Sequence, residues 1–156
     1  TRARYGHIAR VRNALINARL REWHDYIFWI DADLVDYPAD LPTQLHRANP
    51  SGITAPLVLL AGHRNRFYDL AGFIECGRWA GMFPPHFDQD SDLIDLESVG
   101  CCYLAPAALY RSGARYAMTR GYTEHYLICQ LARGQGLPVR CLTTAVAWHA
   151  DMQRYQ

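Results

Sequence analysis

The segment Tyr26-Ile27-Phe28-Trp29-Ile30-Asp31-Ala32-Asp33 gives the clearest structural signal in this chain of 156 residues. Its five apolar residues in a row, most of them aromatic or β-branched, predict a buried β-strand, and we expect this strand to extend to Asp33. Side chains two residues apart in a strand point to the same side. We therefore expect the carboxylates of Asp31 and Asp33 to converge on one point.

Two converging carboxylates at the end of a strand repel each other, and burial increases the cost of their charges. A hard divalent cation satisfies both, and Mg²⁺ or Mn²⁺ held by one or two carboxylates commonly accompanies a phosphate-bearing substrate. Sheets of α/β proteins bind ligands at the carboxyl ends of their strands. The D-x-D pattern of Asp31 and Asp33 therefore predicts a site for a cation and a phosphate, and two solvated acids in an exposed loop are the structural alternative.

The composition is that of an ordinary globular domain, with 50% hydrophobic and 20% charged residues. A net charge of +1 gives no reason to expect a nucleic-acid partner. No apolar run approaches the roughly 20 residues of a transmembrane helix. The five cysteines lack C-x-x-C spacing, which argues against a zinc site or a disulfide framework and indicates buried free thiols. We expect one domain over residues 1–156, and the compartment stays open.

The order of the predicted elements indicates the fold class. We expect helices over 7–22, 40–48, 106–111 and 123–133, and strands over 26–33, 53–60, 99–105, 139–142 and 145–148. This alternation predicts an α/β sandwich with a mostly parallel sheet. Only one helix precedes the strand at 26–33, whereas a nucleotide-binding sheet usually has βα units before such a point. We therefore expect the chain to be the C-terminal part of a larger fold that lacks part of its N-terminal nucleotide-binding half.

The helix predicted over 7–22 carries apolar residues at a spacing of three and four. Ile8, Val11, Leu15 and Ala18 predict the face that packs inward, and arginines occupy much of the remaining surface. Arg12 allows two interpretations. Its guanidinium belongs to a solvated basic face, or it lies near a phosphate or a base.

Six short motifs, taken in order, resemble those of the metal-dependent glycosyltransferases of GT-A fold, in particular the Anp1/Mnn9-type α-mannosyltransferase family. They are Val11-Arg12-Asn13-Ala14-Leu15, Trp29-Ile30-Asp31-Ala32-Asp33, Tyr68-Asp69-Leu70 with Glu75, Asp95-Leu96-Glu97-Ser98-Val99-Gly100, Gly121-Tyr122-Thr123-Glu124-His125 and Val146-Ala147-Trp148-His149. The resemblance extends from about residue 10 to residue 149. It implies a GT-A (Rossmann-like) α/β/α sandwich and the transfer of a mannose-like sugar from a GDP-mannose-like donor to a carbohydrate acceptor.

The resemblance also implies roles for individual residues. In such enzymes the D-x-D binds Mn²⁺ or Mg²⁺ together with the diphosphate of the sugar nucleotide, and a late histidine completes the metal site. Asp33 and His149 correspond to direct metal ligands, and Asp31 contacts the metal through water or holds the ribose. Arg12 is expected near the nucleotide. Asp69, Glu75 and Glu97 are expected to contact the acceptor.

Two stereochemical outcomes remain open, and Glu124 has a different role in each. In a retaining transfer, which the family favours, the leaving phosphate takes the proton of the acceptor and Glu124 orients the acceptor. In an inverting transfer with another nucleotide sugar, Glu124 is the general base. A third alternative is a non-catalytic subunit of a transferase complex, with a protein partner. A metal-dependent phosphohydrolase is a weaker alternative, because too few carboxylates or histidines converge to hold two metals.

The sequence departs from the family pattern at two positions. Gly100-Cys101 replaces an expected pair of glycines, and His125 follows Glu124 where the family has glycine. Both changes lie on the side of the sugar and the acceptor, so the identities of the donor sugar and of the acceptor stay open.

Overall fold

The computed structural model describes residues 2–63, 66–69, 74–75, 78–79, 92–119 and 122–150. Its elements in chain order are α1 (Arg2–Arg19), β1 (Tyr26–Ile30), β2 (Leu34–Asp36), α2 (Leu41–Ala48), β3 (Ile53–Leu60), β4 (Ile74–Glu75), β5 (Arg78–Trp79), β6 (Leu93–Asp95), β7 (Cys102–Pro106), α3 (Ala107–Arg111), α4 (Glu124–Gly134) and β8 (Val139–His149). The prediction of a mixed α/β fold is confirmed, and β3 matches the strand expected over 53–60.

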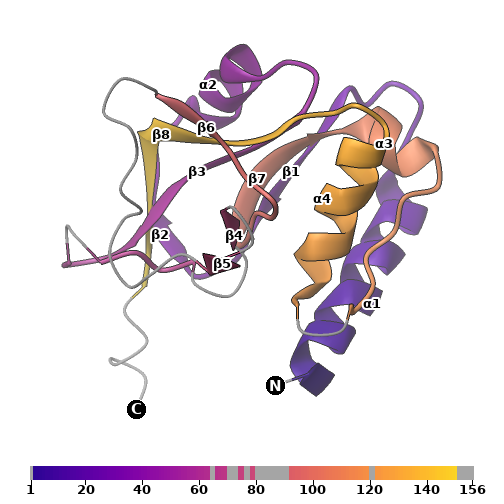
Figure 1. Ribbon diagram of the computed structural model, residues 1–156, viewed down its shortest axis with the longest axis horizontal. Helices are drawn as coiled ribbons and strands as arrows, with labels where there is room; N and C mark the ends of the chain where they lie inside the picture. Colours follow the sequence, from indigo (N-terminus) through magenta and orange to yellow (C-terminus); the bar gives the residue numbers. More distant parts are fainter. Residues whose placement is uncertain are drawn as a thin grey trace.

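Six strands form one mixed sheet in the order β1-β7-β3-β8-β2, and β6 pairs with β8 on the same edge as β2 (Figure 1). Within the described residues, β3 and β8 are the parallel pair, and the other pairings are antiparallel. The prediction of a mostly parallel sheet is therefore wrong. A parallel neighbour requires a long crossover connection, but β7 enters between β1 and β3 in the opposite direction and β2 reverses the chain after a short turn.

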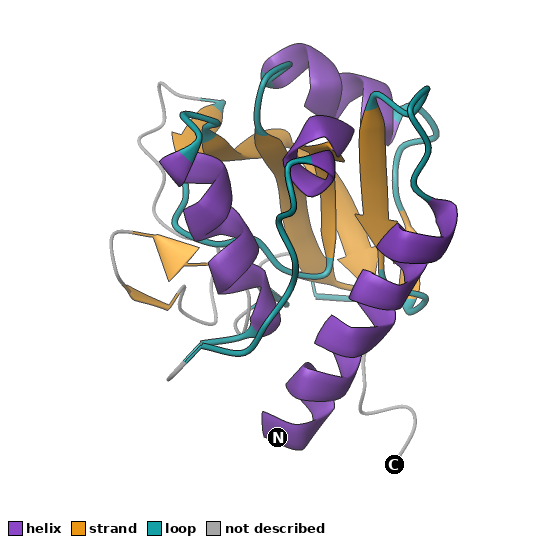
Figure 2. Cartoon of the chain, turned by 90° about the vertical axis from the view of Figure 1, so that its right-hand side faces the viewer, coloured by secondary structure: helices purple, strands orange, loops and turns teal. Residues whose placement is uncertain are grey.

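Helices cover both faces of the sheet and enclose two apolar cores (Figure 2). Alternate residues of β7 illustrate the division. Tyr103 and Ala105 belong to the core beneath α1, α3 and α4, whereas Cys102 and Leu104 belong to the core beneath α2. The four cysteines in the described part of the chain are buried thiols that form no disulfide, as predicted, and Cys76 lies outside the described residues.

The inward face of α1 differs from the predicted one. The buried residues of the helix are Ala9, Arg12 and Ile16, whereas Val11 and Leu15 are 44% and 47% exposed. Small Ala9 and branched Ile16 pack on the core, and the charge of Arg12 is satisfied by distant partners described below. In the described residues, no helix is both long and apolar enough to cross a membrane.

The two strands expected at 139–142 and 145–148 are the two halves of β8, separated by an irregularity. Opposite β3, the paired position in β8 jumps from residue 142 to residue 146, so residues 143–145 are additional. This odd number reverses the faces of the strand. Cys141 packs on the core beneath α4, but Ala147 packs on the core beneath α2. His149, two residues after Ala147, follows the second pattern.

Candidate functional site

The D-x-D residues lie in a turn that crosses the end of the sheet. Because β1 and β2 occupy opposite ends of the strand order, residues 31–33 connect one side of the sheet to the other. The backbone of this turn is fixed at both sides, since Asp31 N donates to Cys101 O at 3.0 Å and Ala150 N donates to Asp33 O at 2.9 Å. The prediction that the strand extends to Asp33 is wrong, because the chain must leave β7 after Ile30 to reach β8. The site nevertheless lies at the carboxyl ends of β1, β3 and β8.

The turn brings Asp33 to the histidine at the end of β8, which is the proximity that the family resemblance implies. His149 Nε2 lies 2.9 Å from Asp33 Oδ1, and the imidazole is 0% exposed. On the other side of the ring, Nδ1 lies 2.8 Å from the carbonyl oxygen of Ala150. Tyr68 stacks on the imidazole, with ring centroids 3.4 Å apart and planes inclined by 12°. The orientation of the imidazole is therefore fixed from three sides.

The chemistry of this pair fits a divalent cation. A carbonyl oxygen only accepts, so Nδ1 carries the proton, and in the neutral imidazole Nε2 then presents a lone pair toward Asp33. Nε2 forms no hydrogen bond with good geometry in the described part of the chain. Two ligands at adjacent corners of an octahedral site with bonds of about 2.1 Å lie about 3 Å apart, close to the observed 2.9 Å. Metal-binding histidines commonly donate their second N–H to a backbone carbonyl, as His149 does.

Two protein ligands are fewer than a closed metal site uses. The described residues contain no group of three or more His, Cys, Asp or Glu side chains that could hold a metal ion. Mg²⁺ bound through one or two carboxylates usually completes its coordination with water and substrate phosphates. The arrangement therefore fits a cation that binds together with a phosphate ligand.

Asp31 faces Arg12 rather than completing a metal-binding cluster. Arg12 Nη2 donates to Asp31 Oδ1 at 3.1 Å, and Nη1 donates to the hydroxyl of Tyr103, also at 3.1 Å. Partial burial raises the pKa of Asp31, Arg12 lowers it, and the nearby charge of Asp33 raises it, so that the net direction is upward. The two acids are thus close enough to influence each other.

Arg12 is held in a cage of aromatic rings and is 6% exposed. Its guanidinium carbon lies 5.0, 5.5 and 5.9 Å from the ring centroids of Trp29, Tyr116 and Tyr103. The tyrosine hydroxyls continue into a network in which Tyr116 contacts Tyr103 and Tyr110, and the indole N–H of Trp29 donates to Tyr110. The structure therefore excludes a solvated basic face at Arg12, and the guanidinium instead fixes Asp31.

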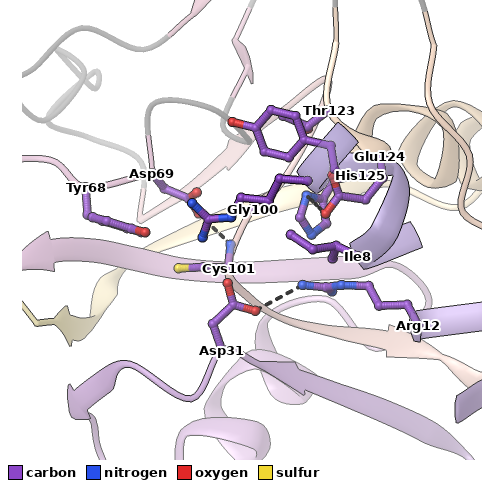
Figure 3. A pocket seen from close by; sticks show the side chains of 12 residues that line it. Ile8, Arg12, Asp31, Tyr68, Asp69, Gly100, Cys101, Thr123, Glu124 and His125 are labelled. Carbon is purple, nitrogen blue, oxygen red and sulfur yellow. Dashed lines mark hydrogen bonds and ion pairs between the residues drawn. The ribbon is translucent and has the colours of Figure 1, made fainter. Parts of the chain in front are cut away.

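A cleft of about 190 Å³ opens beside Asp31 and Arg12 (Figure 3). Its opposite sides are formed by Tyr68 and Asp69 after β3 and by the start of α4, with Gly100 and Cys101 between them. Arg4, Tyr5 and Ile8 of α1 complete the lining. The cleft is thus adjacent to the D-x-D turn and is lined by acids, arginines and a histidine.

Asp69 is held against the backbone that precedes β7. Its Oδ2 accepts from the N–H of Cys101 at 2.9 Å. Burial raises the pKa of Asp69 to about 7, although this hydrogen bond lowers it. The side chain lies so close to Gly100 that a Cβ atom added there would be 1.9 Å from Asp69 Oδ1. The carboxylate thus occupies the space that a side chain at position 100 would need, which explains the glycine there.

The α4 wall of the cleft, defined as Thr123, Glu124 and His125, is polar and lacks partners. These residues are 4%, 1% and 7% exposed. In the described part of the chain, Thr123 Oγ1, Glu124 Oε2 and both ring nitrogens of His125 have no hydrogen-bond partner. Burial raises the pKa of Glu124, whereas burial and the charge of Arg12 lower the pKa of His125 well below its ordinary value. His125 is therefore a neutral imidazole.

The predicted site residues fall into three groups. Asp31, Asp33, His149, Arg12, Glu124 and Asp69 gather around the turn and the cleft. Glu97 is not among the residues that line the cleft and lies close enough to Tyr126 to influence its pKa. The side chain of Glu75 lies outside the described part of the structure.

Sequence reasoning gave no individual role to Tyr68, which stacks on His149, or to Arg4, which lines the cleft. It treated His125 only as a departure from a family pattern. The position of Tyr68 directly before Asp69, and of His125 directly after Glu124, was the available signal, because neighbours of site residues often share the site.

Comparison with known proteins identifies relatives of this chain. The family model described as Anp1 matches residues 1–82. The vanadate resistance protein of Candida albicans is 26% identical over 175 residues, which cover 91% of this chain and 39% of that protein. The mannan polymerase complex subunit mnn9 of Schizosaccharomyces pombe is 26% identical over 92 residues, which cover 59% of this chain and 27% of that protein. The chain thus spans less than half the length of these curated relatives.

The resemblance inferred from the motifs is confirmed by these matches. The matched segment includes α1, the D-x-D turn and β3, which together hold Arg12, Asp31 and Asp33. The family model covers more than half of the 156 residues, and the chain belongs to the Anp1 family.

Proposed function

We propose that this protein is a metal-dependent glycosyltransferase of GT-A fold that moves a mannose-like sugar from a nucleotide-diphosphate donor, GDP-mannose or a similar compound, to a carbohydrate acceptor. Membership of the Anp1 family supports a role in mannosyl transfer, and the similar protein from Schizosaccharomyces pombe is named a subunit of a mannan polymerase complex. The mixed α/β fold, with helices on both faces of the sheet, agrees with this assignment.

The contact between Asp33 and His149 is the observation that carries the proposal. A buried imidazole, oriented by the Ala150 carbonyl and by Tyr68, presents Nε2 to a carboxylate at 2.9 Å. Together these two side chains would hold Mn²⁺ or Mg²⁺. When bound, such a cation offsets the negative charge that develops on the diphosphate leaving group.

The remaining residues of the turn position this pair. Asp31 would hold the ribose or a water molecule, and Arg12 keeps its carboxylate in place through the bond from Nη2. The backbone bonds at Asp31 and Ala150 fix the turn before any ligand binds. Such preorganisation lowers the cost of orienting the diphosphate.

Glu124 lines the cleft in a position from which it can contact an acceptor. We propose a retaining transfer, as the family resemblance implies, in which Glu124 orients the acceptor. In the inverting alternative Glu124 takes the proton of the acceptor hydroxyl, and the burial that raises its pKa would make it a stronger base. Analysis of the anomeric configuration of the product distinguishes the two outcomes.

Calorimetric titration with GDP, in the presence and absence of Mn²⁺, tests the metal site, and UDP serves as the comparison nucleotide. We expect Mn²⁺-dependent binding of one nucleotide and its loss, by at least about tenfold in affinity, in Asp33→Ala. Asp36→Ala is the matched control, because Asp36 is exposed on β2, three residues further along the same segment. Unchanged affinity in Asp33→Ala would remove the assignment.

A protein partner is a further part of the proposal. The named relative is a complex subunit, and Val11, Leu15 and Trp23 expose large apolar side chains on and after α1. A folded protein that binds no nucleotide with or without Mn²⁺ would favour the alternative of a non-catalytic subunit.

A further inference from the structure

We infer that Tyr68 is a positioning residue of the proposed site with two separable parts: its ring holds the imidazole of His149, and its hydroxyl donates a hydrogen bond to a phosphate oxygen of the ligand bound there. This inference deepens the proposed function and rests on it for the presence of a phosphate group. It assigns to one side chain both the orientation of a metal ligand and a contact with the leaving group.

The backbone fixes Tyr68 beside the end of β3, where the chain turns back along that strand. Phe67 forms an antiparallel bridge with Leu59, and the N–H of Tyr68 donates to the carbonyl oxygen of Val58 at 3.0 Å. Side chains alternate along an extended segment. Phe67 accordingly packs in the core beneath α1, α3 and α4, whereas Tyr68 packs against the core beneath α2. Tyr68 therefore approaches His149 from a backbone that the strand already holds.

The ring of Tyr68 carries the first part of the inference. It lies nearly parallel to the imidazole of His149, with ring centroids 3.4 Å apart and planes inclined by 12°. The carbonyl oxygen of Ala150 fixes Nδ1 within the plane of the imidazole, and the stacked ring limits tilting out of that plane. A phenylalanine ring would provide the same surface, so this part does not require the hydroxyl.

The hydroxyl of Tyr68 is not explained by packing. In the described part of the chain no hydrogen bond of this hydroxyl is found. Tyr68 lines the cleft, and Figure 3 shows its hydroxyl pointing toward the space between Asp69 and Cys101. Burial raises the pKa of Tyr68, and the charges of Cys101, Asp33, Asp69 and Asp31 are close enough to raise it further. The hydroxyl therefore extends toward the acids of the site.

A phosphate group that binds at the D-x-D turn meets charges of both signs. Asp31 and Asp69 line the cleft and repel it, whereas Arg4 and Arg12 line the α1 side and attract it. Nη1 and Nη2 of Arg12 are already engaged with Tyr103 and Asp31. The arginines therefore attract the group from the α1 side, and the opposite side needs a donor that adds no negative charge.

Tyr68 supplies that donor on the β3 side. Phosphate oxygens only accept hydrogen bonds, and a tyrosine hydroxyl, with an ordinary pKa of about 10, keeps its proton at neutral pH. Among the other described residues there, Gly100 has no side chain, Asp69 accepts from the N–H of Cys101, and a thiol is only a weak donor. The hydroxyl is therefore the strong side-chain donor that the described residues offer on this side.

The test compares the unchanged chain with three variants. Tyr68→Phe keeps the ring and removes the hydroxyl, and Tyr68→Leu removes both. Tyr37→Phe is the matched control, because Tyr37 is 42% exposed and is not among the residues that line the cleft. Electron paramagnetic resonance measures the affinity for Mn²⁺ alone and, in its pulsed form, the coupling of bound Mn²⁺ to a histidine nitrogen. Calorimetry measures the affinity for inorganic pyrophosphate and for GDP in the presence of Mn²⁺.

The two Tyr68 variants should differ in what they lose. We expect Tyr68→Phe to bind Mn²⁺ alone within about twofold of the unchanged protein and to keep the nitrogen coupling, but to bind pyrophosphate and GDP at least about tenfold more weakly, because hydrogen bonds to charged groups are strong. We expect Tyr68→Leu to lose at least about tenfold in affinity for Mn²⁺ as well, with a weaker nitrogen coupling, since its imidazole is free to tilt. Tyr37→Phe should change none of these values.

Each result bears on a separate part of the inference. Unchanged affinity for pyrophosphate in Tyr68→Phe would overturn the role of the hydroxyl, and so would an equal loss of affinity for Mn²⁺ alone, which would place the hydroxyl on the cation. Unchanged affinity for Mn²⁺ in Tyr68→Leu would overturn the role of the ring. If Tyr68→Leu does not fold, Tyr68→Phe still decides the role of the hydroxyl. Binding of Mn²⁺ and pyrophosphate by the unchanged protein supports the proposed metal site whatever the variants do, whereas absence of both removes that site together with this inference.

Discussion

The D-x-D turn and the α4 wall border the same cleft, but their polar groups differ in how many partners they have within the protein. At the turn, Asp31 is paired with Arg12, and Asp33 lies against His149. On the α4 wall, Glu124 Oε2 and the nitrogens of His125 have no hydrogen-bond partner in the described residues. The backbone of the turn and the carboxylate of Asp31 are thus held by the protein itself, although His149 Nε2 has no hydrogen-bond partner in the described residues, whereas the wall contains four such atoms. Substitutions at the turn should cost stability, and those on the wall should mainly cost binding.

The largest expected effect is that of Arg12→Met. This change removes both hydrogen bonds of the guanidinium and leaves Asp31 without its cation, so we expect the free energy of unfolding to fall by about 3 kcal/mol. Denaturation in urea measures it. Arg10→Met is the control, because Arg10 is exposed on the same helix and should change stability by less than about 0.5 kcal/mol. If both variants lose the same free energy of unfolding, Arg12 contributes no more to stability than an exposed arginine does.

Gly100→Ala should have the next largest effect. The new methyl group would overlap the carboxylate of Asp69, and overpacking of this kind costs about 1–3 kcal/mol. Gly134→Ala is the matched control, since a Cβ there meets no atom within 4 Å. Combining Gly100→Ala with Asp69→Ala should cost less than the sum of the two single changes, because the overlapping groups are then both altered. Additive costs would show that Asp69 does not occupy the space beside Gly100.

The smallest effect, when it is expressed per unit of pH, is the pH dependence of stability that Asp69 contributes. Burial raises the pKa of Asp69 to about 7 in the folded protein, above the roughly 3.9 of an unfolded chain. Between these values the folded state binds more protons than the unfolded state, so the contribution of Asp69 is fully present below pH 4 and is lost as the pH rises toward 7. Its slope is at most about 1.4 kcal/mol per pH unit. Urea denaturation from pH 4 to 7 should show a less negative slope in Asp69→Asn than in the unchanged protein, and identical slopes would exclude the raised pKa.

The parts of the fold that local pattern determines were predictable. The apolar runs at 26–30 and 53–60 are strands, and the start and end of α4 follow Thr123 and the glycines near 134. The proximity of Asp33 and His149 was predicted from the family resemblance, because local pattern shows only that each of them follows an apolar strand. Their role as metal ligands remains a prediction.

The remaining features depend on partners that are distant in the sequence. Arg12 is buried because Asp31 and Tyr103, 19 and 91 residues away, satisfy it. The spacing of Val11 and Leu15 contains no information about those partners. The sheet directions likewise depend on where β7 inserts, which hydrophobic periodicity does not specify. The orientation of His125 toward a cleft cannot be derived from an N-cap pattern, which predicts only the beginning of the helix.

The irregularity in β8 has a consequence for the evolution of the site. The three additional residues, 143–145, decide on which face of the sheet each later side chain of β8 lies. The imidazole of His149 therefore reaches Asp33 only if the number of additional residues is odd. Loss or gain of two residues at this point would preserve the histidine's side of the sheet, whereas loss or gain of one would rotate it toward α4 and abolish its meeting with the carboxylate. Among natural variants of this chain, length changes at 143–145 should therefore occur in pairs.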